Sequence, residues 1–274
     1  MYDYIKCGDS AILMEELEDE SIDLTVTSPP YDGLRTYNGY VFDFEKIAKE
    51  LYRVTKPGGV VVWIVADATI DGSETGTSFR QALYFKDIGF NLHDTMIWNK
   101  NSFTATGTLQ TRYASVFEYM FVLSKGKPKT FNPIKDRKNL HGGEKHQGTI
   151  RQINGTMKQK STTGKILTEY GQRFNIWDIS PERSNETGHP AVFPVNLIQD
   201  HITSWSNEGD VVFDPFLGSG TTAIAARRTN RHFIGFEISE EYFEKTKKRI
   251  EEEISQYTLF DVFGNGMKEE EEHG

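Results

Sequence analysis

An uninterrupted apolar run, VVVWIVA, occupies residues 60–66 of this 274-residue chain. A run without polar alternation is typical of a strand that is covered on both faces, as in a parallel sheet. The amphipathic segment at 42–55 precedes it and is expected to form a helix that ends before Lys56-Pro57-Gly58-Gly59. A strand of this kind needs helices above and below it, so the pattern predicts an α/β fold.

Strand and helix patterns alternate along most of the remaining sequence, which predicts a mixed, mostly parallel sheet with helices on both faces. Between about residues 126 and 175 the periodicity disappears, and an unstructured loop of that length is improbable unless it is a functional insertion. Strands are expected at 21–27, 91–100, 114–125, 174–179, 210–214 and 232–237, and helices at 10–17, 78–90, 194–205, 221–228 and 240–257.

Composition excludes several classes of protein. No window approaches eighteen consecutive apolar residues, and the first thirty residues carry acidic groups instead of a basic segment before an apolar one. We therefore expect a soluble, cytoplasmic protein with no membrane partner. Cys7 is the single cysteine and no Cys/His cluster has zinc spacing, so neither an internal disulfide nor a metal site is expected.

The charge distribution points to nucleic acid although the formal net charge is −9. From Lys125 to Lys165 there are eleven Lys and Arg residues against Asp136 and Glu144, which gives this segment a charge of +9 and leaves −18 elsewhere. A solvated loop is the alternative interpretation. The asymmetry and the interleaved Gly, Asn, Gln, Ser and Thr favour a segment that contacts phosphates and base edges.

A glycine-rich turn in VVFDPFLGSGTT, residues 211–222, predicts a ligand site. Gly218 and Gly220 follow an apolar strand and let the backbone approach a ligand, and the next helix offers unpaired amides. Glu237 ends the following strand, where a carboxylate can accept both hydroxyls of a ribose. A tight turn beside a charged strand end is the alternative, but both features fall at strand carboxyl ends, where open α/β sheets bind ligands.

Several cofactors, including nicotinamide dinucleotides, are compatible with a ribose site and a glycine-rich turn. The turn lacks the G-x-G-x-x-G pattern, and no G-x-x-x-x-G-K-[ST] is present. Asp214 lies directly below the turn, where it would repel a pyrophosphate but suit an ammonium group. The ligand is therefore expected to be an adenosine with a cationic amino-acid arm, and S-adenosylmethionine fits that description.

A second unusual feature is TSPPY at residues 27–31. Ile22, Leu24 and Val26 alternate with polar residues, which predicts a strand through Thr27. Two consecutive prolines then remove two backbone donors and fix φ, so the strand ends in a rigid corner beside a hydroxyl and an aromatic ring.

Together, DPFLGSGTT at 214–222 and TSPPY at 27–31 resemble the cofactor and catalytic motifs of amino-methyltransferases that act on DNA. The catalytic motif comes first, which is similar to the permuted β class. The resemblance covers about residues 4–250 and includes KPGGVVVW, RYASVFEYMFVLSKG and GHPAVFP. It implies a Rossmann-like S-adenosylmethionine-dependent methyltransferase fold with circularly permuted motifs and an inserted target-recognition region.

This resemblance also implies a domain organisation. Residues 1–124 form the catalytic half of the methyltransferase domain, and 189–255 form its cofactor-binding half. Residues 125–188 form the target-recognition insertion, and 256–274 form an acidic tail that we expect to be disordered.

The resemblance gives the proline corner a chemical role. The exocyclic amine of cytosine or adenine is a poor nucleophile, because its lone pair is conjugated with the ring. Hydrogen bonds accepted from its N–H groups would aim that lone pair at the methyl group. The Ser28 hydroxyl and the Pro29 carbonyl are the implied acceptors, Pro30 stiffens the corner, and Tyr31 stacks on the flipped base. A core tyrosine is the alternative for Tyr31.

Further roles follow from the resemblance alone. Asp214 lies near the ammonium, Glu237 binds the ribose, Asp9 reaches the adenine edge, and His189 with Pro190 closes the other side of the cofactor. Arg112 lies beside the target base or pairs with Glu118 or Asp94. The implied cofactor residues are Asp9, His189, Pro190, Asp214, Pro215, Phe216, Gly218, Ser219, Gly220, Thr221, Thr222 and Glu237; the implied DNA-binding residues are Arg112, Lys135, Arg137, Lys138, Lys145, Arg151, Lys158 and Lys160.

The expected function is site-specific methylation of double-stranded DNA at the exocyclic amine of a flipped base. In this family Ser at the first position of the motif is typical of cytosine N4 enzymes and Asp of adenine N6 enzymes, with exceptions, so we expect cytosine N4 and keep adenine N6 as the alternative. An RNA or protein amine methyltransferase and a non-catalytic DNA-binding protein are weaker alternatives. The family context also admits a cognate restriction endonuclease and a homodimer as partners.

Overall fold

The structure is a computed structural model that describes residues 2–30, 42–102, 111–181 and 193–266. Tyr31, His189 and Pro190 lie outside these ranges. The chain divides into two compact units, the first formed by Met1–Asn132 with Ile176–Gly274 and the second by Pro133–Asn175.

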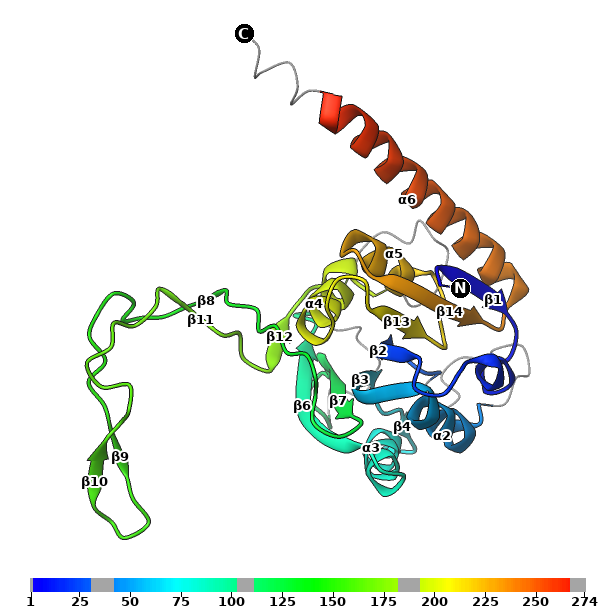
Figure 1. The fold of residues 1–274 in the computed structure, drawn as a ribbon. Helices are drawn as coiled ribbons and strands as arrows, with labels where there is room; N and C mark the ends of the chain where they lie inside the picture. The colour runs from blue at the N-terminus through cyan, green and yellow to red at the C-terminus, as the bar shows by residue number, and fades with distance from the viewer. Residues whose placement is uncertain (1, 31–41, 103–110, 182–192, 267–274) are drawn as a thin grey trace. The chain divides into compact units, whose positions relative to one another are not determined.

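The first unit contains an eight-stranded sheet in the order β1-β14-β13-β2-β3-β7-β6-β12 (Figure 1). Its pairs are parallel except where β7 meets β3 and β6. The sheet is therefore mixed and mostly parallel, as the sequence predicted. The strands are β1 (Tyr4–Cys7), β2 (Ile22–Thr27), β3 (Thr55–Val65), β6 (Asn91–Asn99), β7 (Phe117–Ser124), β12 (Ile176–Asp178), β13 (Val211–Asp214) and β14 (His232–Glu237).

Helices cover both faces of this sheet (Figure 1). Helices α1, α2 and α3 pack on one face, α4 and α5 on the other, and α6 contacts β1, β14 and α5. No helix among the described residues is long and apolar enough to cross a membrane. The helices are α1 (Ser10–Leu13), α2 (Phe44–Val54), α3 (Thr77–Asp87), α4 (Val195–Trp205), α5 (Thr221–Arg228) and α6 (Glu240–Gly266), with a 3-10 turn, η1, at Met14–Glu16.

The apolar run in β3 supplies the centre of the core. Side chains alternate between the faces of a strand, so Val61, Trp63 and Val65 join the cluster under α1, α2 and α3. The intervening residues are also buried. The Trp63 indole N–H donates to Gln81 Oε1 at 2.9 Å, which satisfies the one polar group that this large side chain brings into the core.

Some element boundaries differ from those expected. The helix expected at 10–17 is a short α1 followed by η1. Strand β3 begins at Thr55 and continues through the proline and glycines, with a register shift against β2 that accommodates them. A hairpin of β4 (Thr69–Ile70) and β5 (Ser73–Glu74) was not predicted. Helix α6 continues to Gly266, and disorder of the tail from residue 256 stays a prediction.

The second unit is built from antiparallel pairs. Strand β8 (Arg137–Lys138) pairs with β11 (Tyr170–Gly171), and β9 (Thr149–Arg151) pairs with β10 (Met157–Gln159). No residue of Pro133–Asn175 is buried. This unit has no apolar core, so its structure depends on backbone pairing. The prediction that the insertion extends over residues 125–188 stays a prediction.

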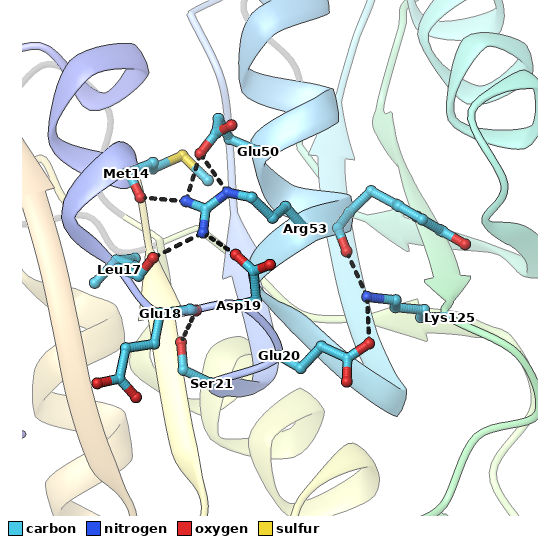
Figure 2. A network of polar contacts seen from close by, with 10 residues as sticks. Met14, Leu17, Glu18, Asp19, Glu20, Ser21, Glu50, Arg53 and Lys125 are labelled. Carbon is cyan, nitrogen blue, oxygen red and sulfur yellow. Dashed lines mark hydrogen bonds and ion pairs between the residues drawn. The ribbon is translucent and has the colours of Figure 1, made fainter.

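Arg53, in the last turn of α2, connects this helix to α1 and η1 beside the amino ends of β2 and β3 (Figure 2). Its guanidinium donates to the carbonyls of Met14 and Leu17 at 2.7 and 2.8 Å, and to Glu50 and Asp19 at 2.6 Å each. One planar cation thus satisfies carbonyls that end α1 and η1 while it pairs with two carboxylates.

Lys125 makes a second link in the same region (Figure 2). Its ammonium donates to the Tyr52 carbonyl at 2.9 Å, pairs with Glu20 at 3.1 Å and lies 4.8 Å from the Tyr52 ring centroid. Although Lys125 belongs to the basic segment of the sequence, its side chain contacts Tyr52 and Glu20 of the first unit.

We predict that Arg53→Met lowers the free energy of unfolding by about 2 kcal/mol, because it leaves half-buried carbonyls without their charged donor. Lys49→Met on the same helix is the control, since Lys49 is exposed and pairs with Glu45 at 3.8 Å. Urea unfolding followed by circular dichroism measures both variants. Equal destabilisation of the two would show that the Arg53 contacts add nothing specific.

Candidate active site

Four residues expected at the site follow the carboxyl ends of four neighbouring parallel strands. Asp9 follows β1, Glu237 ends β14, Asp214 ends β13 and Ser28 follows β2. Parallel strands that are adjacent bring their carboxyl ends to the same edge of the sheet, which is where open α/β folds bind ligands. The fold thus gathers residues that are more than two hundred positions apart in the sequence.

The glycine-rich turn requires its glycines. Gly218 and Gly220 have φ of 53° and 81°, in the left-handed region. A Cβ on Gly220 would lie 2.7 Å from Thr246 Cγ2 of α6, closer than carbon atoms approach without a shift. The turn therefore passes directly against α6 with its backbone, and leads into the first turn of α5, where backbone amides have no intrahelical partner.

Glu237 shapes this turn with both of its oxygens. Oε2 accepts from the Gly218 amide at 2.9 Å, and Oε1 accepts from the Ser239 amide at 2.9 Å. Burial raises the pKa of Glu237, and these backbone hydrogen bonds oppose that rise. A carboxylate accepts about four hydrogen bonds, so its remaining lone pairs are compatible with a ribose.

Asp214 is fully buried and holds three protein donors. Its Oδ1 accepts from the Thr27 hydroxyl at 2.6 Å and from the Phe216 amide at 3.0 Å, and its Oδ2 accepts from the Thr222 hydroxyl at 2.7 Å. Burial raises the pKa of Asp214 to about 6, and the three hydrogen bonds limit the rise. The carboxylate thus connects β2, β13 and α5.

Asp9 caps helix α1. Its Oδ1 accepts from the Ala11 amide at 2.8 Å, which is the usual role of an aspartate at an N-cap. The neighbouring Ser10 is buried and donates to the Pro215 carbonyl. Helix α1 is therefore fastened to the residue that follows Asp214.

Three contacts around the turn were not predicted from the sequence. Besides Ser10, Thr246 of α6 donates to the Gly218 carbonyl, and Arg249 donates to the Ser219 carbonyl at 2.7 Å. Thr246 and Arg249 are one helical turn apart, so both face the glycine-rich turn. Helical spacing was the available signal, but nothing in the sequence indicates which element such a face meets.

Aromatic side chains form one wall beside the turn. The half-buried Phe216 ring meets Phe42 edge-on at 5.5 Å and Trp63 at 6.3 Å between centroids. Ser219 is buried and lies 3.2 Å from the Thr221 hydroxyl, and Pro215 and Thr222 are buried as well. The motif residues expected to hold the cofactor are thus contiguous in space.

The proline corner, Ser28 to Pro30, directly follows the last residue of β2. Pro29 is buried, while Ser28 and Pro30 are half-buried. Thr27, immediately before the corner, pairs with Trp63 in the sheet. The expected roles of Tyr31, His189 and Pro190 fall outside the described residues and stay predictions.

Arg112, which was expected beside the target base or paired with Glu118 or Asp94, contacts the β4–β5 hairpin, and its place beside the target base stays a prediction. It donates to the Gly72 carbonyl and lies 3.7 Å from Glu74, both on the β4–β5 hairpin. Glu118 forms an ion pair with Lys100. The hairpin that carries Glu74 was not predicted from the sequence.

The basic side chains of the second unit fall into two groups. Arg137 lies 4.5 Å from the Phe174 ring centroid and donates to the Gln172 carbonyl, so it supports the β8–β11 pair. Arg151, Lys158 and Lys160 are exposed on or beside β9 and β10, and no described residue forms an ion pair with them. Lys135, Lys138 and Lys145 are exposed as well.

The edge of the sheet fits an adenosine with an amino-acid arm. Asp214 and Glu237 are buried carboxylates with unused lone pairs, and the amides that begin α5 are unpaired, so acceptors and donors lie in one place. A triphosphate would need additional cations beside the turn. Arg249, the cation bonded to the turn here, donates to its backbone.

Comparison with protein families identifies this architecture. The model of the N6/N4 methyltransferase family, described as DNA methylase, matches residues 22–248. Among curated proteins, the chain is 56% identical over 250 residues to the orphan methyltransferase M.BamHII of Bacillus amyloliquefaciens, with 88% of this chain and 93% of that protein covered.

Solved structures show the same fold. The PvuII DNA methyltransferase, described as cytosine-N4-specific, superposes with a TM-score of 0.66 at 24% identity and covers 90% of this chain and 86% of its own. The M1.HpyAVI complex with SAM gives a TM-score of 0.59 at 22% identity, over 89% of this chain and 98% of that chain.

We predict that Asp214→Asn changes how stability depends on pH. The folded-state pKa of about 6 exceeds the ordinary value of 3.8, so between these pH values the folded protein holds a proton that the unfolded chain has released. Acidification from pH 7 to pH 5 should therefore stabilise the wild type, relative to Asp214→Asn, by about 1 kcal/mol.

Denaturant unfolding at the two pH values measures this difference. Asp71→Asn on the exposed β4–β5 turn is the control and should follow the wild type at both. A constant difference between wild type and Asp214→Asn would mean that the Asp214 carboxyl does not titrate in this range.

Proposed function

Since the chain belongs to the DNA methylase family of N6 and N4 amino-methyltransferases, we propose that it methylates the N4 amine of cytosine in double-stranded DNA. The observation that carries the choice of base is Ser28 as the polar residue before Pro29 and Pro30. The cytosine-N4 specificity described for the PvuII enzyme is consistent with this choice. Adenine N6 is the alternative within the same family.

S-Adenosylmethionine is the cofactor, and when bound it supplies an electrophilic methyl group. In this proposal the glycine-rich turn and the first turn of α5 hold its amino-acid end, with Asp214 near the ammonium. Glu237 accepts from the ribose hydroxyls, and Asp9 lies at the adenine edge. The half-buried Phe216 packs against the adenosine, where its ring is already fixed by Phe42 and Trp63.

The proline corner prepares the amine. In our proposal the Ser28 hydroxyl and the Pro29 carbonyl accept hydrogen bonds from the cytosine amine, which favours a pyramidal nitrogen with its lone pair directed at the methyl group. Pro29 and Pro30 have no N–H and a fixed φ, so the corner cannot relax when a base enters. Alignment of this kind can remove a large part of the barrier to a displacement reaction.

We propose that the second unit binds the DNA backbone, and that the proline corner binds the flipped base. A two-stranded ribbon fits the major groove of B-DNA, and β9–β10 carries Arg151 and Lys158 with Lys160 directly after it. Because these cations have no ion pairs with described residues, phosphates are the partners that suit them.

The partners beyond DNA are also proposals. M.BamHII, which is 56% identical, carries the description orphan methyltransferase. By this likeness we propose that the present enzyme acts without a dedicated restriction endonuclease. A homodimer is a further proposal, and the molecular mass of the protein in solution tests it.

The target base is tested by nucleoside mass spectrometry of DNA incubated with the purified enzyme and labelled S-adenosylmethionine. N4-methylcytosine is the expected product. N6-methyladenine as the main product would reject cytosine while it leaves the amino-methyltransferase function intact. Labelled RNA or protein with unlabelled DNA would reject DNA as the substrate.

The role of the basic hairpin is tested by salt dependence. A variant with Arg151, Lys158 and Lys160 all changed to Gln should bind DNA more weakly, and the slope of log K against log salt should flatten by up to about 0.9 for each phosphate that is no longer neutralised. A variant with Lys49, Lys245 and Lys248 changed to Gln removes the same charge from α2 and α6 and should keep the wild-type slope. Equal slopes in both variants would place the phosphate contacts on another surface.

A further inference from the structure

Thr27 makes a buried hydrogen bond at the end of β2. It is the last residue of β2, it is fully buried, and it directly precedes Ser28. Its hydroxyl donates to Asp214 Oδ1 at 2.6 Å. Asp214 is the last residue of the neighbouring strand β13, so this bond joins two strand ends at the edge of the sheet that carries the site.

The bond continues into the cofactor turn. Asp214 accepts from the Thr222 hydroxyl at 2.7 Å and from the Phe216 amide at 3.0 Å. Thr222 lies in the first turn of α5, and Phe216 lies on the turn itself. Hydrogen bonds to one buried carboxylate thus connect the residue before Ser28 with the segment that surrounds the amino-acid end of the cofactor in our proposal.

The pairing of β2 with β13 ends before Thr27. Strands β2 and β13 pair at Leu24 with Val212 and at Thr25 with Phe213, which leaves two residues of β2 beyond the last pair. The next two residues after Thr27 are Ser28 and Pro29, and the two prolines of the corner have no N–H to donate. The Thr27 side chain thus contacts β13 immediately before the corner, beyond the last paired residue of β2.

We infer that Thr27 is a positioning residue for methyl transfer. Through Asp214 it fixes the distance between the acceptors at Ser28 and Pro29 and the cofactor turn, so that the amine of the base and the methyl group meet in line. This inference rests on the proposed function. Removal of the hydroxyl lets the corner move relative to the turn, and displacement reactions are sensitive to shifts of about 1 Å.

The chain provides a matched control on the same strand. Thr25 is also fully buried, and it lies two residues before Thr27, so its side chain faces the same side of the sheet. Its hydroxyl has no hydrogen-bond partner among the described residues. Thr→Val at positions 25 and 27 therefore removes the same hydroxyl from the same face, with the Asp214 bond as the difference.

The experiment measures kcat for DNA methylation and the Kd for S-adenosylmethionine by calorimetry in wild type, Thr27→Val, Thr27→Ser and Thr25→Val. Thr27→Val is expected to lower kcat by about 10- to 100-fold and to leave the Kd within about 3-fold. Thr27→Ser keeps the donor and should restore most of kcat, and Thr25→Val should match the wild type.

Three results would overturn the inference. Equal kcat values for Thr27→Val and Thr25→Val would mean that Thr27 contributes only to packing. A rise in Kd as large as the fall in kcat would assign the bond to cofactor binding. Failure of Thr27→Ser to restore activity would show that the hydroxyl is not the active group. If Thr27→Val does not fold, Thr27→Ala, which also lacks the donor, is measured in its place with the same expectations, and Thr25→Ala is its control.

The wild-type protein separates this inference from the proposed function. If the wild type transfers no methyl group to DNA, the proposed function fails. If the wild type is active and Thr27→Val is equally active, the function stands and the role of Thr27 is rejected.

Discussion

A carboxylate buried at the end of a strand must be surrounded by donors, and the site of this protein is organised by that requirement. The donors to Asp214 come from the end of β2, from the residue after Pro215 and from the first turn of α5. Burial still raises the pKa of Asp214 to about 6, so the donors offset part of the desolvation and not all of it. A group that depends on three donors also fixes the segments that provide them.

Sheet topology explains how such distant segments meet. Thr27 and Asp214 are 187 positions apart in the chain, yet β2 and β13 are neighbours. The second unit enters the sequence between β7 and β12, which lie on the other side of β3 from β13. The four strands that carry the site are therefore uninterrupted by the insertion. Catalytic and cofactor motifs can exchange their order along the chain without any change in this edge, because the edge depends on which strands are adjacent and on their direction.

The sequence was sufficient for the mixed sheet, because apolar runs and glycine breaks are local signals. It was also sufficient to place Ser28, Asp214 and Glu237 at strand ends. It did not indicate the bonds made by Thr27, Thr246 and Arg249, since each depends on a partner brought close by tertiary structure. The β4–β5 hairpin and the pairs of the second unit were missed for another reason: strands of two or three residues that are mostly exposed have no apolar alternation to detect.

The two ends of the sheet make opposite contributions to stability. At neutral pH the ionised Asp214 costs the fold on the order of 3 kcal/mol relative to an ordinary aspartate, and burial also raises the pKa of Glu237. The core around Trp63, Phe85 and Phe213 offsets that cost, as do the Arg53 contacts at the amino ends of β2 and β3. Changes near Arg53 therefore act on activity through the fraction of folded protein. In the proposed function, changes at the carboxyl ends of the strands act on the reaction itself, and those that remove a buried charge can lower activity while they leave the fold as stable or more stable.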